Sequence, residues 1–132
     1  MPMQVELVSP ERTLWSGEAD MVRARTVGGG DIAFLPGHAP FIAALDEWTV
    51  EIVLSGGGRL IAAVHGGFVE VNGVSVKILS DLAELVDQID VERARRAKER
   101  AAAAVHAGDD VEAEAALRRA HVRLVAAGDE AA

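Results

Sequence analysis

The sequence changes its pattern once, near Leu85, and this change limits the chain to a β-rich part followed by a helical part. Before Leu85, short runs of β-branched and apolar residues alternate with glycine, proline and asparagine turns, which is typical of antiparallel sheets. After it, alanine, arginine and glutamate dominate, and these residues favour helices. We therefore expect a β domain over residues 1–86 and a helical domain over residues 87–132.

The β-rich part predicts an N-terminal antiparallel β-sandwich, or flattened barrel, of about ten strands. Over Trp48–Leu54 apolar and polar residues alternate, so this strand should bury one face. Gly56–Gly58 predicts a hairpin turn, and Asn72-Gly73 is the strongest short hairpin signal in the chain. The crossover helices that a parallel α/β sheet needs are missing between these strands.

The helical part predicts a C-terminal antiparallel two-helix hairpin. Asp90 is suited to cap the first helix, which should stop at Gly108. Asp109 and Glu112 are spaced as a capping box for the second helix, which should end near Gly128. The connection is short, so the helices should run antiparallel.

The two helices present stripes of mostly small residues to each other. The stripes are Ala94, Ala97, Ala101 and Ala104 on the first helix, and Ala113, Ala116, Leu117, Ala120 and Leu124 on the second. Alanine permits close approach but removes little apolar surface from water. We expect a weakly held hairpin that can open and find another partner, and a constitutively packed hairpin is the alternative.

Composition excludes several classes of protein. The chain has no cysteine, which excludes disulfides, thiolate metal sites and cysteine nucleophiles. Its net charge of −8 argues against a nucleic acid as the main partner. No apolar run approaches the roughly 18–20 residues of a membrane span, and the N-terminus shows no signal peptide, so we expect a cytoplasmic protein.

The sequence predicts no catalytic residue and no metal site. Tyrosine is absent and the serines lack a nucleophile-elbow context. Neither run of three glycines is followed by Lys-Ser or Lys-Thr, as a phosphate-binding loop requires. His38 and His65 could meet with Glu70 as a third ligand, but nothing in their spacing requires it.

Residues 30–41 predict a contact loop rather than a catalytic one. Pro36, Gly37 and Pro40 favour a rigid, exposed turn. The loop also carries apolar side chains beside one carboxylate and one imidazole: Phe34, Leu35, Phe41, Asp31 and His38. This combination is suited to docking against another protein.

Arginines recur at helical spacing in the second half. Arg93, Arg96 and Arg100 share one helix face, and Arg119 and Arg123 share another. In an antiparallel hairpin that turns near Gly108, Arg93 should lie opposite Arg123, and Arg100 near Arg119. Converging guanidinium groups suit a polyphosphate, although a solvated helix surface is the simpler interpretation of the spacing alone.

Several segments together resemble a known family, the epsilon subunit of bacterial F-type ATP synthases. The resemblance is carried by the loop Gly30–Pro40, the opening segment Val5–Arg12, Trp15–Ala19 and His65–Val71. The order of these segments and the overall length agree as well. The resemblance extends over essentially the whole chain.

This resemblance implies a non-catalytic rotor subunit of the central stalk, which couples rotation driven by protons to ATP synthesis. Its partners would be the gamma subunit, the c-ring of Fo and, through an extended hairpin, the alpha/beta hexamer. The contact loop would use Asp31, Leu35, Pro36, Gly37 and His38. The expected location is the cytoplasmic face of the bacterial cell membrane, without membrane insertion, and the hairpin would regulate ATP hydrolysis.

The same resemblance raises ATP as a regulatory ligand, with no cofactor required. Ile89-Asp90-Val91-Glu92-Arg93-Ala94 matches the nucleotide motif of ATP-binding family members. The residues that would form the site are Glu84, Ile89, Asp90, Arg93, Ala94, Arg100, Arg119 and Arg123. Members with this motif differ in their affinity for ATP, from measurable to very weak binding.

Two other classes of function are weighed against this interpretation. A stand-alone nucleotide-sensing module would need the arginines but not the contact loop. A small β-barrel enzyme of cupin type would need a bound metal. Some features also depart from the family pattern: the Gly56–Gly58 turn carries no charge, the second helix has few large side chains, and the tail is acidic at Asp129 and Glu130.

Overall fold

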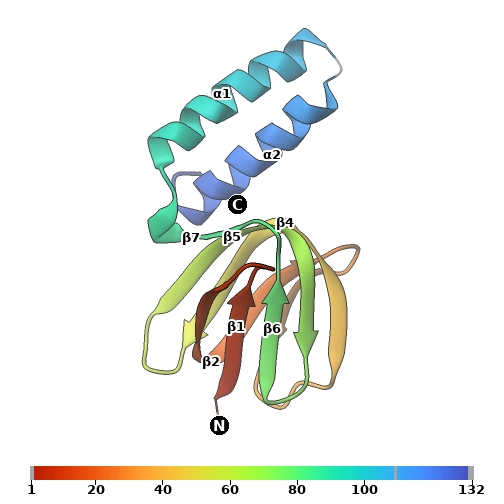
Figure 1. The fold of residues 1–132 in the computed structure, drawn as a ribbon, viewed down its shortest axis with the longest axis vertical. Coiled ribbons are helices and arrows are strands. Elements are labelled where there is room, and N and C mark those ends of the chain that lie inside the picture. Colours follow the sequence, from red (N-terminus) through yellow and green to blue (C-terminus); the bar gives the residue numbers. More distant parts are fainter. Residues whose placement is uncertain (1, 109, 131–132) are drawn as a thin grey trace.

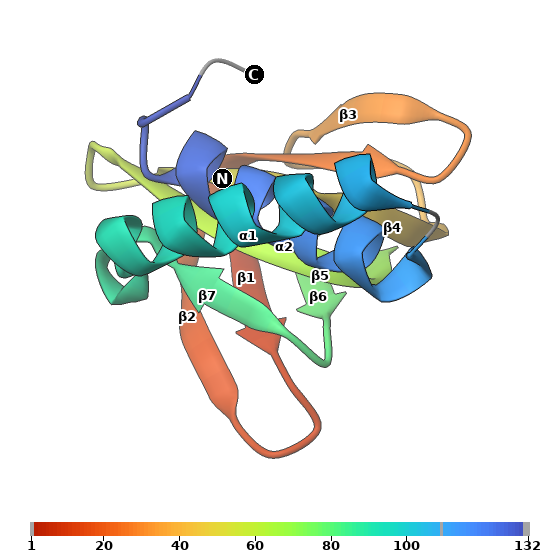
Figure 2. The same cartoon turned by 90° about the horizontal axis from the view of Figure 1, so that it is seen from above.

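The computed structural model describes residues 2–108 and 110–130, and it shows a β-barrel with a helical hairpin across one end (Figures 1 and 2). The strands are β1 (Met3–Val8), β2 (Thr13–Thr26), β3 (Gly30–Phe34), β4 (Phe41–Leu54), β5 (Arg59–Val71), β6 (Ser75–Leu79) and β7 (Ala83–Leu85). They are followed by a short 3-10 helix η1 (Val86–Gln88) and by α1 (Val91–Ala107) and α2 (Val111–Ala126). The expected order, strands first and then two helices, is confirmed.

The sheet closes on itself because β1 pairs with two strands. It runs antiparallel to β2 and parallel to β6, so the path β1-β6-β5-β4-β2 forms a ring. β3 extends the edge of β2, and β7 pairs with β5 near the hairpin. The prediction of a flattened barrel is confirmed, with the correction that the β1–β6 pair is parallel in an otherwise antiparallel sheet.

The prediction of about ten strands is wrong because three strands are long and bent rather than divided. The structure has seven strands in its described residues, and β2, β4 and β5 span 14, 14 and 13 residues. In β5 the bend falls at Gly66 and Gly67, where φ is +85° and +127°. A Cβ on Gly67 would lie 2.0 Å from the carbonyl oxygen of Leu79, so only glycine fits.

The barrel interior follows the alternation in the sequence. Val50 and Ile52 are buried in the core and Leu54 packs against it, as the pattern over Trp48–Leu54 predicted. The largest side chains with almost no exposed surface are Phe34, Met3, Leu7, Ile52 and Ile78 in the barrel, together with Leu124 in the hairpin. Both predicted hairpin turns, Gly56–Gly58 and Asn72-Gly73, connect antiparallel strands.

Both helices begin at an aspartate cap. The Asp90 carboxylate accepts a hydrogen bond from the Arg93 backbone N–H at 3.0 Å, and Asp110 accepts one from Ala113 at 3.1 Å. Because Ala113 stands three residues after the cap, no capping box forms there, and the expected cap Asp109 lies outside the described residues. The first helix ends at Gly108 as predicted, but in extended rather than left-handed backbone.

Alpha helix α2 lies between α1 and the barrel (Figure 1). The buried side chains of α1 are alanines only, Ala94 and Ala101. Against the barrel, α2 places Val122 and Ala126 on Ala63 of β5. Trp48, Ile61 and Ile89 pack around this small cluster. The apolar contact that docks the hairpin is therefore much smaller than the core of the barrel.

Candidate functional site

A pocket of about 350 Å³ opens where β7, η1, α1 and α2 meet. Its lining residues are Glu84, Gln88, Asp90, Arg93, Ala94, Ala97, Arg100 and Arg123. Three of these carry guanidinium groups and two carry carboxylates, so the pocket is polar with a small apolar floor. Its volume lies in the range of small-molecule sites.

Most residues that the sequence grouped as a nucleotide site meet in this pocket. Glu84, Asp90, Arg93, Ala94, Arg100 and Arg123 line it. Ile89 packs instead against the docking cluster of α2. Arg119 does not line the pocket, because its guanidinium hydrogen-bonds Glu112 on its own helix at 2.9 Å. Arg93 and Arg123 thus face one pocket from opposite helices, whereas Arg119 and Arg100 do not share it.

Glu84 is the ionised centre of this pocket. Its Oε1 accepts a hydrogen bond from Arg123 Nε at 2.6 Å and lies 3.3 Å from His65 Nε2. Burial opposes ionisation of the carboxyl, but the hydrogen bonds from His65 and Arg123 outweigh it and lower the pKa of Glu84 below 4.5. The pocket therefore holds Arg123 in a pair with an acid.

The Glu84 pair continues into a chain of five charged or titratable side chains, which we call the bridging network: Arg118, Glu47, His65, Glu84 and Arg123. His65 Nδ1 lies 2.9 Å from Glu47 Oε2, and Glu47 Oε1 lies 3.5 Å from Arg118 Nε. The network starts on α2, crosses β4, β5 and β7, and returns to α2. Sequence reasoning missed it because its members are far apart in the chain and follow no periodic pattern.

The predicted contact loop forms an exposed turn between β3 and β4. Leu35 is 55% exposed, and Gly37 has a φ of +89° that favours glycine. Two hydrogen bonds fix the turn: His38 N–H donates to Leu35 O at 3.0 Å, and Gly37 N–H donates to Gly73 O at 2.8 Å. Pro36 lies in the same turn and is exposed.

The chemistry of the loop differs from the prediction at its aromatic residues. Phe34 has no exposed surface and belongs to the barrel core, and Phe41 packs against that core. The His38 ring rests on both, at centroid distances of 5.2 and 5.9 Å. Asp31 is paired with Arg25 at 3.0 Å. The expectation that Phe34 and Phe41 offer outward contacts is therefore wrong, and Leu35 is the exposed apolar residue of the loop.

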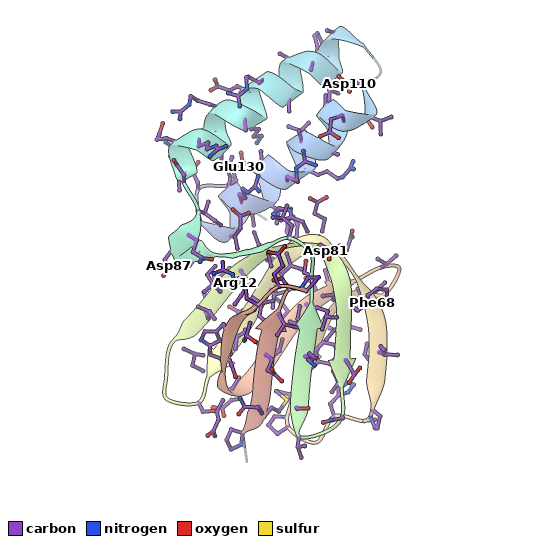
Figure 3. All side chains as sticks on the ribbon, viewed as in Figure 1. Arg12, Phe68, Asp81, Asp87, Asp110 and Glu130 are labelled. Carbon is purple, nitrogen blue, oxygen red and sulfur yellow. The ribbon has the colours of Figure 1, made fainter. Side chains whose placement is uncertain are left out.

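An exposed apolar strip lies on the outer surface of the barrel nearby. Phe68 on β5 is 57% exposed and stands opposite Leu79 on β6, which is 45% exposed. Ile42, two residues from the β4 partner of Phe68, is 68% exposed. Figure 3 labels Phe68 at the side of the barrel. We call Ile42, Phe68 and Leu79 the outer strip.

The acidic tail folds back onto α1 and forms a second charged cluster. Gly128 has a φ of +78°, and the Asp129 N–H donates to Leu124 O at 2.9 Å, which closes a Schellman motif at the end of α2. Arg95 Nε then donates to Asp129 at 3.0 Å, and Lys98 pairs with Glu130. We call these four side chains the tail clasp. Figure 3 labels Glu130 beside the hairpin.

These pairs keep the tail carboxylates ionised. The hydrogen bond from Arg95 lowers the pKa of Asp129, and the hydrogen bond from Lys98 lowers the pKa of Glu130. His121 of α2 adds a contact to Glu130 at 2.7 Å. The clasp thus joins α1 to the end of α2 by charge.

Neither helix within residues 2–108 and 110–130 has the length and hydropathy that a membrane crossing requires.

Family comparison matches both parts of the chain in order. A sequence model described as ATP synthase, Delta/Epsilon chain, beta-sandwich domain matches residues 2–86. The long alpha-helix domain of the same description matches residues 87–128. The chain belongs to the ATP synthase delta/epsilon family.

Curated members of this family are similar over nearly their whole length. An ATP synthase epsilon chain of Streptomyces griseus is 49% identical over 92% of this chain and 92% of its own length. An ATP synthase epsilon chain of Thermobifida fusca is 49% identical over 97% of this chain and 93% of its own. Another from Rhodococcus opacus is 44% identical over 93% of this chain.

Solved ATP synthases contain chains of the same fold. A chain from the Euglena gracilis mitochondrial ATP synthase OSCP/F1/c-ring structure has a TM-score of 0.74 and 23% identity, and the match covers 97% of this chain and 78% of that one. A chain from the Tetrahymena thermophila mitochondrial ATP synthase central stalk and c-ring has a TM-score of 0.52, covers 72% of this chain and 71% of that one, and is 16% identical. At these identities the likeness concerns the fold.

Proposed function

We propose that this chain is the non-catalytic epsilon subunit of a proton-translocating F1Fo ATP synthase, a rotor subunit that couples c-ring rotation to ATP synthesis. The observation that carries the proposal is the match of both family domains, in order, over residues 2–86 and 87–128. Curated relatives that cover more than nine-tenths of the chain are named ATP synthase epsilon chain. The proposed location is the cytoplasmic face of the bacterial cell membrane, without insertion.

Two exposed features of the barrel are suited to binding other proteins. The loop with Leu35 is rigid and carries little chemistry that could act on a substrate. The outer strip of Ile42, Phe68 and Leu79 is a contiguous apolar surface of the kind that proteins use for docking. We assign the strip to the gamma subunit and the loop to gamma and the c-ring.

Co-elution tests the rotor assignment. The chain is mixed with a complex of alpha, beta and gamma subunits and run on gel filtration, and ATP hydrolysis is measured in the same fractions. Phe68→Ser should weaken co-elution, whereas Val111→Ser, which changes an 81% exposed residue of α2, should not. A wild-type chain that elutes apart from the complex would contradict the assignment and favour a stand-alone nucleotide sensor.

The hairpin is proposed to regulate hydrolysis by leaving the barrel and extending along gamma toward the alpha/beta hexamer. Support comes from the small docking cluster of Ala63, Val122 and Ala126 and from the alanines that α1 buries. A chain ending at Val86 should still co-elute with the complex but should change the rate of ATP hydrolysis. Loss of co-elution would show that the barrel alone does not carry assembly.

ATP is proposed as a regulatory ligand of the pocket. The pocket joins α1 and α2 beside the barrel, and Arg93, Arg100 and Arg123 supply charge for phosphate groups. A ligand there would select the docked hairpin, because ligands shift an equilibrium by their differential affinity. Arg93→Ala should reduce ATP binding in a calorimetric titration. Arg96→Ala removes a guanidinium from the same helix outside the pocket, and it should leave binding unchanged.

A further inference from the structure

The turn between β5 and β6 contains the only asparagine of the chain, Asn72, followed directly by Gly73. The side-chain carbon Cγ of an asparagine is an electrophile that the backbone nitrogen of the next residue can attack, and glycine offers that nitrogen without a side chain in the way. Within residues 2–108 and 110–130, the Gly73 N–H donates no hydrogen bond. Asn72 is exposed, so water reaches both groups.

Two hydrogen bonds hold the side-chain oxygen of Asn72. Its Oδ1 accepts from the Ser75 N–H at 3.0 Å and from the Ser75 Oγ–H at 2.8 Å. When a nitrogen attacks Cγ, negative charge develops on this oxygen, and donors that already point at it lower the barrier. The Asn72 Nδ2 makes no hydrogen bond within the described part of the chain, so it is free to leave as ammonia.

We propose that Asn72-Gly73 is a site of spontaneous deamidation. Hydroxide removes the proton of the Gly73 N–H, and the nitrogen forms a bond to Asn72 Cγ. The bond from Cγ to Nδ2 then breaks, and ammonia leaves with a proton from water, which gives a five-membered succinimide. Water opens this ring at Cγ to give aspartate, or at the main-chain carbonyl carbon to give isoaspartate. Water is the only co-reactant, and no oxidant or reductant is needed.

The isoaspartate product should disturb the contact loop. It adds one atom to the backbone between residues 72 and 73, whereas the aspartate product keeps the path of the chain and changes only its charge. Gly73 O accepts a hydrogen bond from the Gly37 N–H of the contact loop at 2.8 Å. A longer backbone moves this oxygen, so the Gly37 N–H should lose its partner. The modification is a property of the chain alone and does not depend on the proposed function.

Mass spectrometry of the full chain tests the proposal. In mildly alkaline native buffer, the chain should gain with time the mass that replaces an NH₂ group by OH, together with one negative charge on ion exchange. Asn72→Ser keeps an acceptor oxygen at this position but cannot form the succinimide, and it should show neither change. A native chain that stays unmodified, while the same chain unfolded in urea deamidates, would overturn the proposal.

Variants of Ser75 test whether the fold assists the reaction. Ser75→Ala removes the Oγ–H donor and should slow deamidation roughly fivefold in native buffer, the effect of one hydrogen bond, with no change in urea. Ser75→Thr keeps a hydroxyl donor and should keep the native rate. A native rate that Ser75→Ala leaves unchanged would overturn the assisting role. If that variant fails to fold, the comparison of native and urea-unfolded wild-type chains decides the question.

Hydrogen exchange tests the consequence for the contact loop. The isoaspartate and aspartate forms are separated by chromatography after incubation, and exchange of the Gly37 amide is measured in each. Exchange should be faster in the isoaspartate form and close to that of the unmodified chain in the aspartate form. Equal exchange in the two forms would overturn the inferred link between the turn and the loop.

Discussion

The barrel and the hairpin of this chain are stabilised by different forces. Barrel side chains such as Phe34 and Ile52 have no exposed surface and belong to one core cluster inside a closed sheet. The hairpin buries mostly alanines, and it is joined to itself and to the barrel by ion pairs, among them Arg123–Glu84 and Arg95–Asp129. Apolar burial involves no charge that salt could screen or pH could neutralise, whereas partly exposed ion pairs respond to both. The barrel should therefore keep its structure when salt or pH changes, whereas the docking of the hairpin should depend on both.

The largest expected effect comes from comparing the truncation of one buried side chain in the barrel with a similar truncation in the hairpin. Ile52→Ala opens a cavity in the barrel core and should lower the free energy of unfolding by about 3–4 kcal/mol. Leu124→Ala removes a similar side chain, 1% exposed, from the hairpin. It should raise hydrogen exchange in the helices while leaving urea unfolding of the barrel nearly unchanged. Equal losses of barrel stability in both variants would mean that the two parts unfold as one unit.

A substitution at the bend of β5 is the second test of the stability of the barrel. Gly67→Ala places a Cβ against the Leu79 carbonyl oxygen and forces alanine into a φ of +127°. The expected loss of unfolding free energy is about 2–4 kcal/mol, from backbone strain and overpacking together. Gly57→Ala in the β4–β5 turn also has a positive φ but meets no atom within 4 Å. Gly57→Ala should lose less unfolding free energy in the same urea titration, because it adds backbone strain without the clash. Equal losses in the two variants would contradict this account of the bend.

A charge substitution at the docking contact should act on the hairpin alone. Glu84→Gln removes the acid shared by His65 and Arg123 and should weaken docking by about 1–2 kcal/mol, since the carboxylate is only partly buried. Hydrogen exchange in α2 measures this change. Glu70→Gln, an exposed acid opposite Lys77 on the barrel, is the matched control.

The pH dependence of the Glu84 contribution follows from its lowered pKa. A carboxyl with a folded-state pKa below its ordinary value of 4.5 contributes its full stability above that value. The contribution is lost as the pH falls through the lower, folded value. Hydrogen exchange in α2 should therefore become faster at low pH in the wild-type chain, and this increase should be missing in Glu84→Gln.

The smallest effect is expected at the tail clasp. Replacing Asp129 by Asn and Glu130 by Gln should slightly raise hydrogen exchange in α1 at low salt. The difference should vanish at about 1 M salt, where the screening length falls to a few ångströms. Glu99→Gln removes an exposed acid from α1 that has no ion pair within the described part of the chain, and it should change little. A difference that survives high salt would show that the tail packs by more than charge.

The sequence was most informative where a feature depends on neighbouring residues. Asp90 and Gly108 marked the ends of α1, and Asn72-Gly73 marked a hairpin, because caps and turns are determined within a few residues. The strand count failed because Gly66 and Gly67 bend a strand instead of ending it. Phe34 was predicted to offer an apolar contact on the exposed loop, yet strand alternation turns it into the core.

The site was predictable only in its helical half. Arg93 and Arg123 could be placed opposite each other by helix geometry, and both line the pocket. Arg119 could not be excluded from it, since its pairing with Glu112 depends on side-chain conformation. Glu47 and His65 come from strands, where pairing partners 18 residues apart follow from sheet register rather than from any local pattern.

The two-glycine bend of β5 also brings two different surfaces of the barrel close together along the chain. On one side of the bend, His65 contacts Glu84, which pairs with Arg123 of α2; on the other, Phe68 belongs to the outer strip. Only Gly66 and Gly67 separate them in the chain. The outer strip and the side of the barrel that faces the hairpin are therefore formed by adjacent segments of a single continuous strand.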